Sequence, residues 1–271
     1  MVKRLPSNLQ DALRIRSEER VIPYFGGTDL MVRGNRTENF LFLNQISEIK
    51  DLVITEDKMR IGAGVTYRQV LEEEKTPQLF QRIVWEIASP PLRNMASIIG
   101  NVCNASPVGD TLPYFYVLNA ELELKSATGE RRVPITEFIT GARKTSLRED
   151  ELVTAIECEI KSFNNEYYQK VGPRKACSIS KVDFVGLAQV EEGVVKDLRM
   201  AFGAVKDTIV RDQVLEGDYI GKSLEEVKAA AEEIANRVDQ IITPIDDKRS
   251  TEDYRRAVVR NMVLDFVGNL K

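Results

Sequence analysis

The residue types in this chain leave few routes to chemistry performed by side chains alone. It contains no histidine, which excludes a Ser-His-Asp or Cys-His nucleophile, an imidazole proton shuttle and any histidine-containing metal site. Its three cysteines, Cys103, Cys158 and Cys177, include no Cys-x-x-Cys pair. We therefore expect neither a structural zinc site nor a self-contained iron–sulfur cluster. If the protein performs demanding chemistry, a bound organic cofactor must supply it.

A first candidate binding segment runs from Tyr24 to Leu30. There a predicted strand ends in Gly26-Gly27, and Thr28-Asp29 is expected to begin a short helix. Glycine lets backbone N–H groups approach an anion closely, and the start of a helix carries partial positive charge. Asp29 is expected to cap the turn rather than to bind phosphate. On this segment alone, an ordinary strand–turn–helix explains the residues equally well.

A second candidate segment is Asn94–Ala120, which contains one charged residue, Asp110, although 30% of the chain is charged. Small, polar, turn-forming residues dominate the segment, and they predict irregular backbone whose N–H and C=O groups need partners. Such a loop suits a large neutral or anionic ligand that is bound by backbone amides and hydroxyls. A buried structural loop is the alternative interpretation.

Three other patterns are weaker. The Gly62–Gly64 segment resembles half of a dinucleotide fingerprint but lacks the third glycine and the acidic residue, so we interpret it as a turn. The Arg143-Lys144 pair is expected to be solvated, with a phosphate or a partner subunit as the alternative. Four cationic residues fall in or beside predicted strands: Lys170, Arg174, Lys175 and Lys181. A buried lysine among them would stabilise a developing anion, although solvated lysine ends are the default.

These segments need elements that position them, and a length of 271 residues suggests about two folding units. Alternation and turn residues predict strands at 21–25, 40–44, 52–55, 58–62, 121–125, 131–135, 167–171, 177–182, 184–190 and 194–205. Capping residues and helical periodicity predict helices that begin at Ser7, Thr66, Pro77, Ser223 and Ser250. The mixture predicts an α+β fold that ends in a sheet followed by helices.

Composition excludes several classes of protein. The net charge is −4, and the chain contains no clustered basic stretch, which argues against a nucleic-acid partner. The apolar runs are far shorter than the roughly 20 residues that cross a bilayer, and the start of the chain lacks the apolar stretch of a secretory signal. A few unpaired cysteines suit a reducing compartment. We therefore expect a cytoplasmic protein without a membrane span.

Taken together, the motifs resemble those of the FAD-binding medium subunit of the molybdenum hydroxylases, the family of xanthine dehydrogenase, carbon monoxide dehydrogenase and nicotinate dehydrogenase. The matching motifs follow the family's order over nearly the whole chain: Gly26–Leu30, Arg93–Asn101, Asn104–Pro113, Gly141–Thr145, Lys170–Ala176 and Pro244–Asp247. The resemblance implies a two-subdomain FAD-binding fold of the vanillyl-alcohol-oxidase/PCMH type plus a C-terminal sheet-and-helix domain. The implied divisions are residues 1–57 and 58–163 for the FAD-binding subdomains and 164–271 for the C-terminal domain.

The resemblance also implies the site. One pyrophosphate loop would comprise Pro23, Tyr24, Phe25, Gly26, Gly27, Thr28, Asp29 and Leu30, and a second loop would contain Ser97, Gly100 and Asn101. Asp110 would bind the sugar or adenine side of FAD. Lys170 would lie near the flavin pyrimidine edge, where a cation stabilises the reduced flavin. The implied set is completed by Ser106, Pro107 and Leu152, and it includes no catalytic residue and no metal ligand.

One position departs from the family pattern. The second loop usually reads Thr/Ser-x-Gly-Gly-Asn, whereas Ile99 stands here in place of the first glycine. If that position required a positive φ, isoleucine would be strongly disfavoured. We nevertheless expect FAD to bind, and to bind without covalent attachment, because the chain has no histidine to carry it.

The resemblance implies an electron-transfer flavoprotein subunit. Molybdopterin on a large subunit and [2Fe–2S] clusters on an iron–sulfur subunit would be the partners, and electrons would pass to FAD and then to an acceptor, with NAD expected. An autonomous oxidase or reductase of the vanillyl-alcohol-oxidase type is a second hypothesis. A scaffold subunit that has lost FAD is a third, and Ile99 is its only support in the sequence.

Overall fold

The computed structural model describes residues 2–32, 34, 38–174 and 177–271. The chain divides into two compact units. Unit 1 comprises Met1–Ala105 and Asn119–Ile160, and unit 2 comprises Ser106–Leu118 and Lys161–Lys271. The chain thus leaves unit 1 for the short segment 106–118 before it returns. The three-part division expected from the sequence stays a prediction.

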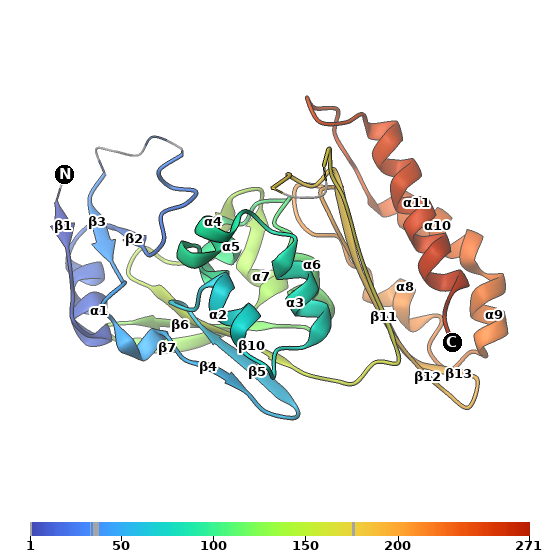
Figure 1. Ribbon diagram of the computed structural model, residues 1–271, viewed down its shortest axis with the longest axis horizontal. Coiled ribbons are helices and arrows are strands. Elements are labelled where there is room, and N and C mark those ends of the chain that lie inside the picture. The colour runs from blue at the N-terminus through green and yellow to red at the C-terminus, as the bar shows by residue number, and fades with distance from the viewer. Residues whose placement is uncertain (1, 33, 35–37, 175–176) are drawn as a thin grey trace. The chain divides into compact units, whose positions relative to one another are not determined.

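Unit 1 combines a parallel sheet with a larger antiparallel one (Figure 1). The parallel sheet has the order β1-β3-β2, with β1 at Lys3–Arg4, β2 at Ile22–Tyr24 and β3 at Phe40–Phe42. The antiparallel sheet has the order β4-β5-β10-β6-β7, with these strands at Leu52–Ile54, Lys58–Gly62, Leu152–Glu159, Glu121–Ser126 and Gly129–Pro134. The strands β8 (Ile139–Gly141) and β9 (Lys144–Thr145) form a separate two-stranded antiparallel hairpin. The predicted strands of this unit are confirmed, with ends displaced by one or two residues.

The helices of unit 1 are short. They are α1 (Leu9–Glu18), the 3-10 helix η1 (Ser47–Ile49), α2 (Tyr67–Glu72), α3 (Gln78–Trp85), α4 (Pro90–Met95), α5 (Ile98–Asn104) and α7 (Ile135–Phe138). The predicted capping box is present, because Thr66 and Gln69 bond reciprocally at the start of α2. The Ser89-Pro90-Pro91 sequence does not simply stop a helix. Instead the prolines occupy the first turn of α4, where a missing N–H costs nothing.

The uncharged segment Asn94–Ala120 is not the irregular loop that its composition suggested. Two short helices, α5 and α6 (Leu112–Val117), lie within it. Ser97 caps α5. Burial of apolar side chains on both helices offsets the conformational entropy lost when the polar residues of the segment become ordered. Ala105 ends α5 in the left-handed region with φ 45°. The small residues thus serve as helix caps and turns rather than as an extended loop.

Unit 2 is a three-stranded antiparallel sheet with helices. Strands β11 (Asn165–Val171), β12 (Val182–Glu191) and β13 (Val194–Gly203) are adjacent in that order. The predicted hairpin turn is confirmed, because Glu192 and Gly193 both have positive φ between β12 and β13. Besides α6, the helices are α8 (Gln213–Gly217), α9 (Leu224–Ala229), α10 (Ala231–Ile241) and α11 (Glu252–Gly268).

Three boundaries in the chain differ from prediction. The strand expected at 177–182 is absent from residues 177–181, because Cys177 has φ 50° and Lys181 N–H already bonds back to the Val171 carbonyl. Thr251 rather than Ser250 caps α11, and Asn8 rather than Ser7 caps α1. The Ser223 capping box at α9 is confirmed. Among the described residues, no helix is both long and apolar enough to cross a membrane.

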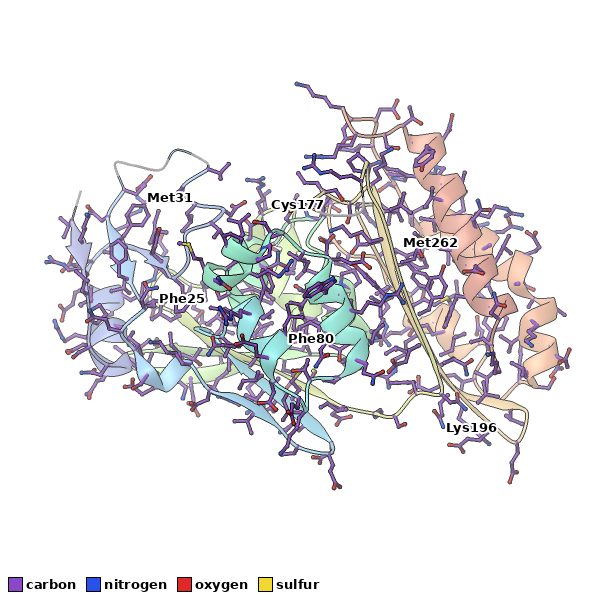
Figure 2. All side chains as sticks on the ribbon, viewed as in Figure 1. Phe25, Met31, Phe80, Cys177, Lys196 and Met262 are labelled. Atoms are coloured by element: carbon purple, nitrogen blue, oxygen red, sulfur yellow. The ribbon has the colours of Figure 1, made fainter. Side chains whose placement is uncertain are left out.

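The two faces of the unit 2 sheet differ in character. On one face, the rings of Phe184 and Phe202 stack with centroids 4.5 Å apart, and Phe266 of α11 packs edge-on against Phe184. Met262 of α11 belongs to the same buried core (Figure 2). The opposite face carries Arg199, whose guanidinium donates to the Val117 carbonyl over 2.8 Å. That bond satisfies the free C-terminal end of α6 and anchors segment 106–118 in unit 2.

Replacing Phe184 with alanine should test this core. We expect Phe184→Ala to lower the free energy of unfolding by about 3–5 kcal/mol, because the fully buried ring leaves a cavity between the sheet and α11. Chemical denaturation measures the change. The control Val214→Ala, at a side chain that is 75% exposed on α8, should change stability by less than about 0.5 kcal/mol. Equal losses in both variants would contradict the assignment of the core.

Candidate functional site

The Gly26-Gly27 loop follows β2 and has no room for side chains. A Cβ on Gly26 would lie 2.0 Å from the Met95 carbonyl oxygen, and a Cβ on Gly27 would lie 2.0 Å from the Tyr24 hydroxyl. Gly27 also has φ +65°, a conformation that favours glycine. Asn44 holds the loop through a bond from its Nδ2 to the Phe25 carbonyl at 3.1 Å. Both glycines are therefore required by close contact with neighbouring atoms.

The helix expected to begin at Thr28-Asp29 does not form. Residues 28–32 are hydrogen-bonded turns, in which the Met31 N–H bonds to the Gly27 carbonyl over 3.0 Å. This loop therefore does not present the partial positive charge of a helix start to an anion. What it offers are the backbone groups of Gly26 and Gly27, which carry no side chain of their own.

The second expected loop is the junction of α4 and α5. Ser97 is the N-cap of α5, and its Oγ accepts the Gly100 N–H at 3.0 Å. The chain before the cap is held by Val65–Tyr67, because Ile98 N–H bonds to the Val65 carbonyl and Tyr67 N–H bonds to the Ala96 carbonyl. The start of α5 is therefore a fixed part of unit 1.

Ile99 does not strain this junction. It lies within the first turn of α5, and its side chain is buried. It is absent from the residues with positive φ, so the conformational objection to isoleucine at this position does not apply. The departure from the family pattern therefore gives no structural support to a scaffold subunit that has lost FAD.

Contact between Gly26 and the Met95-Ala96 backbone places the two expected pyrophosphate segments side by side in unit 1. A Cβ on Gly26 would also lie 3.2 Å from the Ala96 Cα, one residue before the Ser97 cap. The other predicted residue of this unit, Leu152, begins β10 and is buried opposite Lys125. The sequence predicted these segments separately, and the tertiary structure brings two of them together.

Arg93, which the sequence identified only as part of a motif, has a structural role here. Its Nη1 donates to the carbonyls of Trp85, Ile87 and Ala88 at 3.1, 3.0 and 2.9 Å. The guanidinium also lies over the Trp85 ring, 5.1 Å from its centroid. It thereby fixes the turn between α3 and α4, which leads to the α5 cap.

Unit 2 contains a buried cluster of charged and polar side chains. The Lys170 Nζ lies 2.6 Å from Asp110 Oδ2, and the Ser180 Oγ donates to Asp110 Oδ1 over 2.5 Å. The Lys170 side chain is only 5% exposed, and Ser180 is wholly buried. Lys170 is therefore the buried lysine that was considered among the four cationic residues. The default expectation of a solvated lysine is wrong at this position.

The residues around Asp110 hold this cluster in place. The Pro107 carbonyl accepts the Ala204 N–H at 2.8 Å, and the Ser106 carbonyl accepts the Gly109 N–H at 2.9 Å. These bonds fix the turn that carries Asp110 at the end of β13. Of the other predicted cations, Lys181 lies over the Tyr254 ring, 4.9 Å from its centroid, and Lys175 falls outside the described residues.

Sequence reasoning missed two members of the cluster, Ser180 and, at the start of β12, Asp183. Asp183 is wholly buried, and neither of its carboxyl oxygens has a hydrogen-bond partner among the described residues. Burial, reinforced by the Asp110 carboxylate and opposed by the Lys170 ammonium, raises the pKa of Asp183 well above its usual range. An acidic residue inside the apolar strand around Phe184 was the signal that could have identified it.

The three cysteines lie on α5 (Cys103), on β10 (Cys158) and after β11 (Cys177). All three are free, and burial raises the pKa of Cys158 to about 12, so its sulfur remains a thiol. The part of the chain that the structure describes contains no group of three or more acidic or cysteine side chains placed to hold a metal ion.

Comparison with known proteins gives consistent relatives. Residues 4–158 match the family described as the FAD binding domain in molybdopterin dehydrogenase, and residues 167–270 match the CO dehydrogenase flavoprotein C-terminal domain. The glyceraldehyde dehydrogenase medium chain of Sulfolobus acidocaldarius is 29% identical over 266 residues, which cover 95% of this chain and 93% of that one. The xanthine dehydrogenase FAD-binding subunit of Escherichia coli O157:H7 is 28% identical over 253 residues, covering 90% and 86%.

Solved structures share the fold. A chain of Cu,Mo-CO dehydrogenase superimposes with a TM-score of 0.90 at 22% identity, covering 98% of this chain and 96% of that one. A chain of quinoline 2-oxidoreductase from Pseudomonas putida 86 gives a TM-score of 0.89 at 18% identity, covering 98% and 95%. The chain therefore belongs to the family of flavoproteins that carry the FAD-binding domain of molybdopterin dehydrogenases, as its motifs predicted. Its cofactor is FAD, and it is a flavoprotein subunit of an oxidoreductase of the xanthine dehydrogenase and CO dehydrogenase type.

A single methyl group at position 26 should test the contact between the two unit 1 segments. We expect Gly26→Ala to weaken FAD binding at least tenfold, because the added Cβ must push the loop away from the Met95 carbonyl. Titration of the purified chain with FAD, followed by flavin fluorescence, measures the affinity. The control Gly129→Ala, where a Cβ meets nothing within 4 Å, should bind as the wild type does. Unchanged affinity in a folded Gly26→Ala variant would contradict the role of the contact.

Restoring the family's glycine should test the interpretation of Ile99. Because Ile99 is helical and buried, Ile99→Gly should lower the free energy of unfolding by about 3–5 kcal/mol through the lost side chain and the added backbone freedom. The FAD affinity of the folded variant should not improve. Denaturation and FAD titration of the same preparation check both statements, and tighter FAD binding by the variant would contradict them.

Proposed function

We propose that this chain accepts electrons from [2Fe–2S] clusters on an iron–sulfur subunit and passes them through FAD to NAD. The substrate would be oxidised at molybdopterin on a large subunit. Its relatives support this arrangement, because they are named as a medium chain and as a FAD-binding subunit. The cysteine positions support it as well, because the described residues hold no ligand set for a cluster of their own.

The observation that carries the proposal is the close approach of Gly26 to the Met95-Ala96 backbone. It joins segment 23–30, in which Asp29 is the one charged residue, to the uncharged start of α5 at Ser97, and backbone amides and hydroxyls suit a pyrophosphate. We assign the binding of the FAD diphosphate to residues 23–30 together with Ser97, Gly100 and Asn101. Both glycine positions leave no space for a Cβ, so the residues present fit the cofactor.

When bound, FAD supplies the capacity to exchange electrons singly with a cluster and in pairs with a nicotinamide. The role proposed for unit 2 is to provide a cation close to the flavin. Lys170 is fixed by Asp110 and by its place in β11, so it does not need to reorganise when charge develops nearby. Asp110, Ser106 and Pro107 are proposed to contact the sugar side of the cofactor, and Leu152 to contribute apolar surface.

Removing the Lys170 charge should change the flavin's redox potential. We expect Lys170→Met to retain FAD and to lower its midpoint potential by about 30 mV or more, which corresponds to about 1.4 kcal/mol for a two-electron couple. Spectroscopic redox titration of the FAD-loaded chain measures the potential. The matched control is Lys196→Met, an exposed lysine near the other end of the same sheet (Figure 2). Equal potentials in the two variants would contradict the proposed role of Lys170.

Two measurements test the proposed function as a whole. The purified chain should bind one FAD, and NADH should bleach the flavin absorption of the loaded chain in the absence of oxygen. A chain that takes up no FAD would overturn the site, whereas FAD uptake without bleaching by NADH would overturn the acceptor alone. Purification from the native source with metal analysis should recover molybdenum and iron on accompanying chains.

A further inference from the structure

The buried acid Asp183 occupies a defined place in the unit 2 sheet. The register pairs Lys170 of β11 with Asp183 of β12, and Asp183 in turn with Gly203 of β13. Side chains of directly paired residues project from the same face of a sheet, so these three positions form one row. The row lies at the end of the sheet where β11 ends, β12 begins and β13 ends.

Gly203 gives the Asp183 carboxyl its space. A Cβ at position 203 would lie 2.2 Å from Asp183 Oδ1 and 2.8 Å from Oδ2. Any side chain there would displace the carboxyl from its position beside Lys170. The chain thus keeps a wholly buried acidic group at this point and leaves the opposite position empty to accommodate it.

The charges around this row do not balance if both acids are ionised. Asp110 already accepts the Lys170 ammonium and the Ser180 hydroxyl, so an ionised Asp183 would add a second buried negative charge with no hydrogen bond among the described residues. Two carboxylates beside one ammonium are unfavourable in a site closed to water. A protonated Asp183 leaves the cluster neutral.

Among the residues that the structure describes, no cation besides Lys170 is placed to neutralise Asp183. The guanidinium of Arg255 on α11 donates to the carbonyls of Lys181 and Ala204, which lie within two residues of the row, and it pairs with Asp247. The Lys181 ammonium lies over the Tyr254 ring. The charged groups that act on Asp183 are therefore Asp110 and Lys170. The Nη atoms of Arg255 are bonded elsewhere, and its buried Nε has no hydrogen-bond partner among the described residues.

We propose that Asp183 is a positioning residue that is held protonated in the folded chain and that sets the net charge with which Lys170 acts on the flavin. Its loss of a proton changes the charge of the cluster by one unit. Ionised Asp183 would oppose the Lys170 ammonium and disfavour added negative charge on the flavin. The effect on the flavin rests on the proposed function, whereas the proton held by Asp183 is a property of the chain itself.

The first test needs no cofactor. A group whose pKa is raised on folding keeps its proton in the folded chain at pH values where the unfolded chain has lost it. Its contribution to the stability of the folded chain is therefore full at low pH. That contribution declines as pH rises toward the folded-state pKa. Above about pH 5, the unfolding constant of the wild type should rise relative to that of Asp183→Asn by up to tenfold per pH unit, until Asp183 loses its proton in the folded chain as well. Denaturant titrations of both chains measure the ratio.

A control and a second measurement keep this test decisive. Asp207→Asn makes the same change at an exposed carboxyl after β13 and should leave the pH dependence of the wild type unaltered. Infrared difference spectra of the folded wild type should show loss of a protonated carboxyl band at alkaline pH, and that band should be absent from Asp183→Asn. A pH-independent ratio of unfolding constants, or no such band in the wild type, would overturn the proposal.

The second test concerns the flavin. In FAD-loaded chains, the midpoint potential of the wild type should fall below that of Asp183→Asn as pH rises, and the two should coincide at low pH. Potentials that coincide at every pH would overturn the link from Asp183 to the flavin. Failure of the wild type to bind FAD would instead overturn the proposed function, and the denaturation test would still decide the state of Asp183.

Discussion

The close packing of Gly26 against the Met95 carbonyl is the contact on which the unit 1 site depends. It requires a residue without a side chain, and it brings the end of β2 to the cap of α5. Several local bonds support it from both sides. Asn44 donates a hydrogen bond to the loop, and the Val65–Tyr67 backbone forms hydrogen bonds with the chain on either side of Ser97. A site made of backbone groups needs this support because backbone groups can be aimed only by fixing the chain itself.

Unit 2 meets a different constraint, the burial of charge. Its sheet is apolar on the face that packs on α11, whereas the other face carries Arg199 and the row that contains Lys170 and Asp183. Each buried cation there has an acceptor, either a carboxylate or a free carbonyl at the end of a helix. Asp183 differs because no donor meets its carboxyl among the described residues. With Asp183 protonated, the charges of Lys170 and Asp110 cancel. With Asp183 ionised, the buried cluster would carry a net negative charge.

The elements that local sequence determines were predicted well. The capping boxes at Thr66 and Ser223, the hairpin at Glu192-Gly193 and strands β2 to β7 follow from residues within a few positions of one another. The central strand β10 was not predicted. The errors arose where local signals conflict with tertiary contacts. Segment 94–120 looks irregular by composition, yet its apolar side chains are buried, and burial stabilises α5 and α6. Thr28-Asp29 has the composition of a helix start, yet only turns follow it.

The sequence by itself determined the family and its cofactor, because motifs of glycines, small polar residues and Lys170 occur in a specific order. It also predicted the positions that we propose for FAD binding, since close approach of the backbone requires glycine. Only the tertiary structure decided that Ile99 is compatible with its site, that Lys170 is buried against Asp110, and that Asp183 belongs to the same cluster. These outcomes depend on strand register and burial, which bring together residues as distant in sequence as Asp110 and Asp183.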